Sequence, residues 1–384
     1  GHQLRADDDI GGPLRDALDL GLERAGAGIH VRGQHRDARV GKERRRLFLR
    51  AAVPLLGEVR AAHIGLGHAG VFVDQPALGN LRWLFGAQAL GQVRVGGNLA
   101  IGGFGQFANV SQTGINNNAD VDQFGDGNND ANVNQAGTDS SARVDQSGNA
   151  RGEEANITQL ATAANNSATI NQTGDSSTGA PQNRSEANIT QGGGSLNTAT
   201  TTQSGFEQFA DANQSGSGNS SLITQSGAGN SADVDQTGDD NDSQVVQQGN
   251  PFFTGVPNDV FVTQIGVANS SIVDAQNGDG SNTVDVDQTG TLNTSLIAQG
   301  SGAAAGNSIA LTQIGDSNQS TITQASGIFA DANSISATQD GDRNVSLIDQ
   351  QGFSNSITLF QGGADNKSTI DQAGDSNTAT VTQT

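Results

Sequence analysis

The sequence predicts an all-β fold over residues 96–384, a β-solenoid of stacked strand-turn-strand rungs with two parallel sheets. Three observations predict it: a Gln that returns at a regular interval, an alternation of side chains within each interval, and a composition unsuited to a thick core. Of the 384 residues, 53 are Gly, none is Cys, Met or Tyr, and only 33% are hydrophobic. We expect a weakly structured, partly helical segment to precede the solenoid.

The composition excludes several functions. A formal net charge of −21 argues against nucleic acid and anionic membranes as partners, because both attract clustered positive charge. The absence of Cys excludes disulfides, thiol catalysis and Cys-ligated metals. No run of 18 apolar residues exists, so the chain is not expected to span a membrane. We predict no cofactor and no catalytic or metal site.

The composition changes near Gly96, where we place a domain boundary. Residues 1–95 hold 14 of the 19 basic residues and all five His, whereas residues 96–384 hold five basic and 30 acidic residues. Residues 13–25 and 42–49 are candidate amphipathic helices, although glycines interrupt most apolar stretches nearby. The role of residues 1–95 is unknown, and we consider that they are disordered or are not native coding sequence.

The repeat is an 11-residue unit of the form N-x-a-x-V-x-Q-x-G-x-x, where a is small. Between Gln112 and Gln383, 23 Gln anchors define 22 intervals, of which 12 are 11 residues long and four are 12. Alternate residues of a strand point to opposite faces, so the period-two pattern within each unit predicts a strand. We expect the Q-x-G-x-x-N link to form the turn, with Gly taking a positive φ and Asn tolerating one.

Val or Ile precedes most anchors by two residues and should line a thin core between the sheets. The core residues predicted from this position are Val234, Ile322, Ile348, Leu359, Ile370 and Val381. One unit departs from the pattern: Asn269 lies seven residues before Gln276 and Asp274 takes the aliphatic place, so we expect a bulge there.

Two consecutive units should make one rung, which places identical amides one rung apart. Buried amides are costly unless they are hydrogen-bonded, and stacking satisfies them along the axis. The predicted amide ladder contains Gln225, Gln236, Gln313, Gln324, Gln350, Gln361, Gln372, Gln383, Asn230, Asn344, Asn355, Asn366 and Asn377.

Outward carboxylates are candidate gatekeepers of stacking. Asp122 and Asp145 should lie one rung apart on one face, as should Asp349 and Asp371. Like charges at about 4.8 Å repel, which should raise their pKa values and slow stacking at neutral pH. The competing interpretation is ordinary solubilising surface charge.

The units resemble the curlin repeat family, the subunits of bacterial curli fibres. The family pattern Q-x-G-x-x-N-x-A-x-V-x-Q recurs as QSGAGNSADVDQ at residues 225–236 and as QAGDSNTATVTQ at residues 372–383. The resemblance covers residues 106–383 and implies a secreted functional amyloid, a fibre or pilus of the biofilm matrix that serves adhesion. It also implies a homologous nucleator subunit and an outer-membrane secretion pore as partners, although no secretion signal is visible at Gly1.

Self-assembly is the function that the repeat predicts, since an uncapped last strand after Gln383 would offer a template to another copy. An alternative is a calcium-binding solenoid adhesin, suggested by residues 126–130 and by Asp239, Asp240 and Asp242. Another is an ice-binding solenoid, suggested by the outward residues Thr198, Thr200, Thr202, Thr378, Thr380 and Thr382. An enzyme is not expected, because the repeats place their carboxylates at regular outward positions instead of in a cleft.

Overall fold

The structure is a computed structural model. It describes residues 106–384 apart from seven stretches, 125–128, 149–151, 175–183, 250–257, 277–281, 301–305 and 326–331. Before residue 106 it describes only the backbone of six strands: β1 (Ile29–Arg32), β2 (Leu47–Ala51), β3 (Val59–Arg60), β4 (Val71–Val73), β5 (Phe85–Gln88) and β6 (Asn98–Gly102). No helix occurs in these described parts, and none of them could therefore cross a membrane as a helix.

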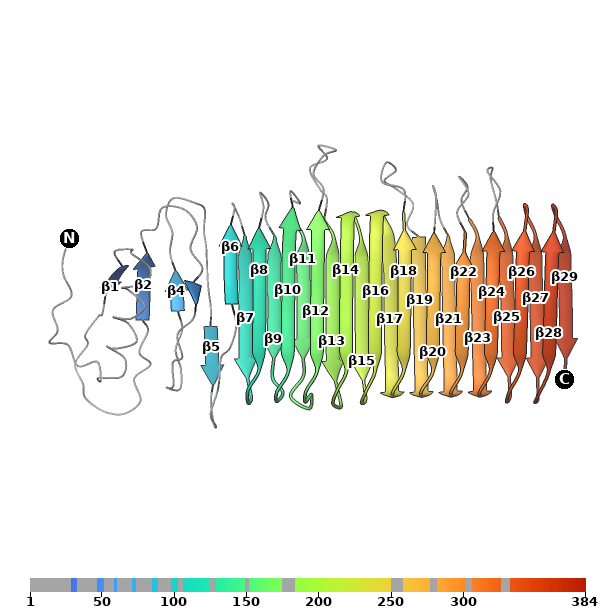
Figure 1. Ribbon diagram of the computed structural model, residues 1–384, viewed down its shortest axis with the longest axis horizontal. Helices are drawn as coiled ribbons and strands as arrows, with labels where there is room; N and C mark the ends of the chain where they lie inside the picture. Colours follow the sequence, from blue (N-terminus) through green and yellow to red (C-terminus); the bar gives the residue numbers. More distant parts are fainter. Residues whose placement is uncertain are drawn as a thin grey trace.

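Two parallel sheets of 13 strands each form a β-solenoid, as the sequence predicted (Figure 1). Sheet 1 contains β3, β6, β8 (Asn118–Phe124), β10 (Ser141–Gly148), β12 (Ser167–Gly174), β14 (Thr198–Phe206), β16 (Ser220–Ala228), β18 (Asp242–Gln248), β20 (Ser270–Gln276), β22 (Thr294–Gln299), β24 (Gln319–Ala325), β26 (Val345–Gln351) and β28 (Lys367–Ala373). Sheet 2 contains β5, β7 (Phe107–Thr113), β9 (Asp130–Gln135), β11 (Glu154–Gln159), β13 (Glu186–Gly192), β15 (Phe209–Ser215), β17 (Asn230–Asp239), β19 (Asn258–Val267), β21 (Thr283–Thr291), β23 (Ser308–Asp316), β25 (Ser334–Asp340), β27 (Ser356–Gly362) and β29 (Thr378–Gln383).

From β5 to β29 each strand pairs with the strand two places along the chain, so successive strands alternate between the sheets. The register places like residues opposite each other: Gln350 pairs with Gln372 in sheet 1, and Gln361 pairs with Gln383 in sheet 2. The strands lie side by side along one axis with little change of direction (Figure 1). One rung is therefore two strands, one from each sheet, and the polypeptide advances by one strand spacing per rung.

A thin core of Ala, Val, Ile and Leu fills the space between the sheets. Strand after strand alternates buried and outward side chains, because a strand turns successive side chains to opposite faces. Of the core residues predicted from the sequence, Val234, Ile322, Ile348, Leu359 and Ile370 are buried. Val381 lies in the outermost strand β29 and is half-buried against the same core.

The segment before residue 96 contributes strands where it is described. β1, β2 and β4 form a separate three-stranded sheet. The expected helix over residues 42–49 is wrong at Leu47–Leu49, which belong to β2, because Leu and Phe there pair with β1 and β4. The expected helix over residues 13–25 lies outside the described residues. β5 pairs with β7, so strand pairing extends back across residue 96.

The turns need two residues with positive φ, and the sequence predicted only one of them correctly. Gly of the Q-x-G link has positive φ, and a Cβ at Gly238 would lie 2.0 Å from the carbonyl oxygen of Gly266 one rung away. The second is not the Asn but the residue before it, such as Leu292 with a φ of 58°. The reason is that the Asn already begins the next strand, where its backbone must be extended for its side chain to face inward.

The expected bulge at Gln276 is wrong. β20 pairs with β18 and β22 without interruption, with Val273 opposite Val245 and Ile297. Ala275, not Gln276, occupies the anchor position, opposite Gln247 and Gln299. Asn269 and Val273 keep their usual places relative to Ala275, so the register is set by these two residues and does not require Gln at the anchor.

Replacing Leu292 by Asn should stabilise the protein. Leu292 is 55% exposed and has a φ of 58°, a conformation that costs an L-residue with a branched side chain about 1 kcal/mol more than it costs Asn. We expect the free energy of unfolding in urea to rise by about 1 kcal/mol for L292N. The control is L296N, because Leu296 is similarly exposed but extended within β22, where Asn is disfavoured. An equal change in the free energy of unfolding for L292N and L296N would show that the positive φ of Leu292 does not destabilise the protein.

Candidate functional site

Two Gln ladders run through the interior, one along each sheet. In sheet 1 the Nε2 group of Gln225 donates to Gln247 Oε1 (2.8 Å), Gln324 to Gln350 (2.9 Å) and Gln350 to Gln372 (2.9 Å). In sheet 2 the corresponding bonds join Gln236 to Gln264 (2.8 Å), Gln313 to Gln339 (2.8 Å) and Gln361 to Gln383 (2.8 Å). Every bond has the same direction, from the amide nitrogen of one rung to the amide oxygen of the next rung toward the C-terminus.

The same Gln side chains also tie the two sheets together. Gln225, in sheet 1, donates from Nε2 to the carbonyl oxygen of Phe209 in sheet 2 (2.8 Å). Gln236, in sheet 2, donates to the carbonyl oxygen of Ser220 in sheet 1 (2.8 Å). Both hydrogens of the amide are therefore used, one along the axis and one across the core. Sequence reasoning missed this second bond, since a period shows which residues stack but not which backbone group each one reaches.

The inward Asn residues stabilise the turns more than they bond to one another. The backbone N–H of Asn366 donates to Asn344 Oδ1 in the preceding rung (3.1 Å). Asn344 Nδ2 donates to the carbonyl oxygen of Gly363 in the next turn (2.9 Å), and Asn355 Nδ2 donates to that of Gly374. Asn230 Nδ2 and Asn377 Nδ2 bond to carbonyl oxygens four residues earlier. An amide-to-amide bond also joins Asn366 to Asn344 (3.0 Å).

The sheet 1 ladder has a gap at Ala275. Gln247 has no Gln in the next rung and donates instead to the carbonyl oxygen of Asn258 (2.9 Å). On the other side of the gap, Gln299 Oε1 is buried and accepts no hydrogen bond. Gln299 donates onward to Gln324 (3.0 Å), so the ladder resumes after one rung.

The comparisons with known proteins agree with this geometry. The family model for the curlin associated repeat matches residues 197–227, 222–249, 330–359 and 354–384. These segments of the chain are curlin associated repeats, which supports its assignment to the curlin repeat family. A comparison with curated proteins gave no match. The strands between the matched segments, from β19 to β24, keep the same register as the matched curlin repeats on either side.

One rung replaces the inward Asn by a buried acid. The backbone N–H of Glu153 donates to Asn129 Oδ1 (3.1 Å), as that of Asn219 does to Asn197 Oδ1 (3.0 Å). Glu153 is 1% exposed, and its Oε2 atom has no hydrogen-bond partner. Burial raises the pKa of Glu153 to about 8, because the charged form loses its hydration and gains no partner. Repeat analysis missed Glu153, which breaks the Asn pattern.

The four gatekeeper candidates lie on the outer face of sheet 1. Asp122 is the register partner of Asp145, and Asp349 of Asp371. The first pair has a cation between its members: Arg143 lies 3.8 Å from Asp122 and 3.5 Å from Asp145, measured between nitrogen and oxygen atoms. Its repulsion is thus offset, an arrangement that the acidic pattern alone did not reveal. Their role in controlling stacking stays a prediction.

Sheet 2 carries stacked carboxylates whose pKa values are raised. Asp211 and Asp233 are register partners in β15 and β17. Burial, followed by the charges of Asp235 and Asp211, raises the pKa of Asp233 to about 6. Burial also raises the pKa of Asp211, against the lowering effect of its hydrogen bond with Asn213. Sequence reasoning did not single out Asp211 and Asp233, because it weighed like-charge spacing and not burial.

The residues behind the two alternative functions are dispersed. Asp239 accepts from the backbone N–H of Ser217 (2.9 Å), and no group of three or more His, Cys, Asp or Glu is placed to hold a metal ion in the described part of the chain. Residues 126–128 lie outside that part. Thr200 has Leu222 as its partner in the next rung, and Thr382 has Phe360, so neither threonine column continues.

Filling the ladder gap at Ala275 should stabilise the solenoid. In A275Q the new Nε2 group can donate to Gln299 Oε1, and the new Oε1 can accept from Gln247. A buried acceptor left unpaired costs about 1 kcal/mol or more, so we expect the free energy of unfolding to rise by about 1 kcal/mol. The control is A337Q, which places an amide at a core position without ladder partners and should destabilise. Denaturation in urea compares the two, and a loss of stability in A275Q would contradict the ladder account.

Glu153 should make the stability of its rung depend on pH. Its folded pKa lies above the ordinary value of 4.5, so the folded state holds the proton more tightly, and stability falls as pH rises from about 4.5 through about 8. We expect amide hydrogen exchange in β9, β11 and β13 to quicken over this range, after correction for the intrinsic pH dependence of exchange. In E153Q the side chain cannot ionise, and this acceleration should be lost. The same dependence in E153Q would assign it to other carboxylates.

Proposed function

We propose that the protein is a structural, self-assembling subunit of an extracellular, curli-like amyloid fibre that supports biofilm matrix and adhesion. The observation that carries this proposal is the polarity of the Gln ladders. Each amide donates toward the C-terminus, so the two ends of a ladder differ and complement each other. Such a ladder can continue from one copy to the next without a change of geometry.

The ends of the ladders support head-to-tail stacking. At the C-terminal end, Gln383 Nε2 donates to the carbonyl oxygen of Lys367 (2.9 Å) and Gln372 Nε2 to that of Ser356 (3.4 Å). Each keeps one amide hydrogen for a further rung. At the other end, Gln112 Oε1 and Gln123 Oε1 are buried and accept no hydrogen bond. Donors at one end and acceptors at the other are what a second copy requires.

The outermost strands provide the backbone part of the same contact. β28 and β29 are the last strands of the two described sheets, and each presents one row of backbone groups that has no partner within them. At the opposite end β5 and β6 pair with β7 and β8, and β3 pairs with β6 in the antiparallel direction. An incoming copy would have to displace these short strands, so we propose that the segment before residue 106 restrains growth at that end.

The proposed setting follows from the family. Curlin repeats are the repeats of extracellular curli subunits, which supports a location at the cell surface. We propose further that a homologous nucleator subunit starts the fibre and that the chain leaves the cell through an outer-membrane pore. Copies of the chain itself are the principal partner, and the structural role of the family supports a non-enzymatic function.

Proline in the outermost strands should stop growth without unfolding the subunit. Ser356 N–H donates to the carbonyl oxygen of Asn377, and a parallel ladder alternates, so the N–H of Thr380 points away from β27. By the same alternation the N–H of Thr369 points away from β26. We expect T369P/T380P to elongate preformed fibre seeds at least tenfold more slowly than the wild type, because proline cannot donate to an incoming strand.

The control is T369A/T380A, which keeps both N–H groups and should elongate at the rate of the wild type. Circular dichroism of the monomers checks that the proline variant keeps its β-structure. Wild-type fibres should give the 4.7 Å meridional reflection of strands stacked along the axis. Elongation of the folded proline variant at the rate of the control would refute growth through these edges.

A further inference from the structure

The outer face of sheet 1 has almost no charge over its central rungs. Between β12 and β24 its outward strand positions hold only two charged residues, Asp242 and Asp274. Sheet 2 is different, since Asp211 of β15 and Asp233 of β17 are stacked acids and β21 carries Asp285 and Asp287 on its outer face. In a chain with a net charge of −21, an uncharged face is where a second copy can approach with the least repulsion.

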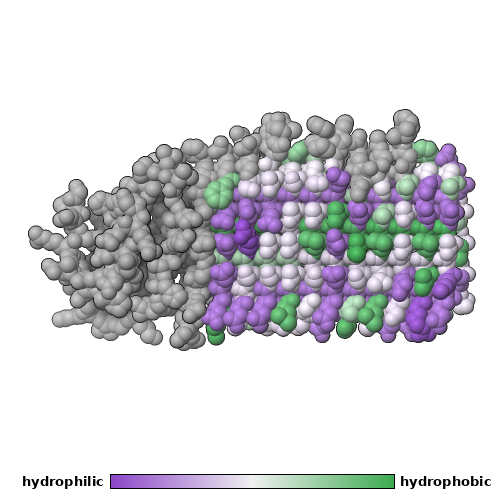
Figure 2. Space-filling model, in the orientation of Figure 1, coloured by the Kyte–Doolittle hydropathy of each residue, from purple (hydrophilic) through white to green (hydrophobic). Residues whose placement is uncertain are grey.

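One column of this face is largely apolar. Leu222, Ile272, Leu296 and Leu347 occupy the same register position in β16, β20, β22 and β26, and this position is Gln244 in β18 and Thr321 in β24. They are 37%, 38%, 47% and 47% exposed. A band of hydrophobic residues along the axis, over the rungs nearer the C-terminus, is visible in Figure 2. An exposed apolar row of this length is typical of a surface that is covered in an assembly.

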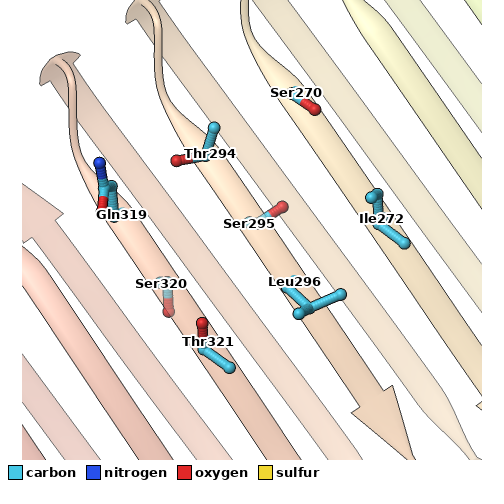
Figure 3. A pocket seen from close by; sticks show the side chains of 8 residues that line it. All are labelled: Ser270, Ile272, Thr294, Ser295, Leu296, Gln319, Ser320 and Thr321. Atoms are coloured by element: carbon cyan, nitrogen blue, oxygen red, sulfur yellow. The ribbon is translucent and has the colours of Figure 1, made fainter.

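Side chains of different size follow one another along this column, so side chains of an opposing surface can pack between them. Ile272 and Leu296 project from neighbouring strands, and in the next rung the column drops to Thr321 (Figure 3). The residues Ser270, Thr294, Gln319 and Ser320 complete a shallow hollow around them. A leucine from an opposing surface can enter such a hollow, as side chains do where two sheets pack face to face.

We propose that this face of sheet 1 pairs with the same face of a second copy, so that two solenoids associate side by side. The strand spacing supports this occupant, because a surface with a repeat of about 4.8 Å matches another β-sheet rung for rung. The little-changing strand direction in Figure 1 keeps the two faces in contact along their length. This contact is lateral and differs from the end-to-end stacking of the proposed function. The pairing depends on that function only where it is measured in fibres.

The area available is sufficient for a stable contact. The seven strands from β12 to β24 extend about 34 Å along the axis, and a strand of six or seven residues spans about 20 Å. The face therefore covers roughly 700 Å² on each copy, close to the figure of about 800 Å² per partner in standard protein interfaces. In a fibre the same contact recurs in every subunit, so many weak contacts act together and the overall association is tight.

Mass per length of fibres, measured by scanning transmission electron microscopy, tests the pairing. We expect wild-type fibres to have twice the mass per length of a single solenoid, and I272K/L296K fibres to have half the wild-type value. The matched control is A310K/S336K, which places two lysines on neighbouring strands of the outer face of sheet 2. It should keep the wild-type mass per length. The variant I272S/L296S removes the apolar surface without adding charge and should also reduce pairing.

The outcomes separate the pairing from the proposed function. A single-solenoid mass per length in wild-type fibres, or halving by A310K/S336K alone, would overturn the pairing and leave end-to-end stacking intact. If the wild type forms no fibres, the proposed function fails, and sedimentation of the full chain decides the pairing: a dimer that I272K/L296K dissociates supports it, and a monomer overturns it. Single solenoids that bind phosphatidylcholine vesicles through Ile272 and Leu296 would assign the face to a lipid surface and overturn the pairing.

Discussion

The buried Gln amides of this solenoid depend on partners one rung away and across the core. A Gln that donates to Gln ahead of it and to the opposite sheet leaves no hydrogen of its side chain unpaired, as Gln225 and Gln236 show. This requirement fixes the register, because a slip of one residue would turn the amides outward and bring outward acids into the core. It also explains how a chain with 33% hydrophobic residues maintains an interior: the core needs only small aliphatic side chains between two rows of satisfied amides.

The same requirement explains where the chain tolerates variation. The turns that lead from sheet 2 to sheet 1 stack glycine on glycine, and from Gly216 to Gly341 the next glycine leaves no space for a Cβ. All seven undescribed stretches after residue 106 fall on the other side, between a strand of sheet 1 and the next strand of sheet 2. Extra residues there leave the ladders in register. The gap at Ala275 shows a second kind of tolerance, since one missing amide is bypassed when backbone carbonyls accept the hydrogen of Gln247.

The sequence was sufficient to predict the fold, because in a solenoid the spacing of the repeat determines which residues of successive rungs lie opposite each other. The spacing of Gln225, Gln236 and their successors predicts which residues stack, and the structure has them stacked. Interactions between residues that do not follow the repeat were harder to predict from the sequence. The left-handed residue before each Asn, the cation at Arg143 and the isolated acid at Glu153 depend on where a side chain lies in three dimensions. The error at Gln276 has the same origin: residue identity was used as the marker of register, whereas Asn269 and Val273 define it.

Ladder polarity also bears on how a fibre could grow. Because every Gln bond runs in one direction, two copies that meet by like ends would place donors against donors or acceptors against acceptors. Only head-to-tail contact continues the ladders, which selects an open, growing assembly over a closed dimer. The N-terminal strands β5 and β6 put Ala87 and Ile101 at the register positions of Gln112 and Gln123, where the ladders begin. Neither residue has a carboxamide side chain that could donate to Gln112 Oε1 or Gln123 Oε1. A second copy that displaces β5 and β6 could donate to these two acceptors, whereas β28 and β29 need no such displacement. The two ends of a fibre should therefore grow at different rates.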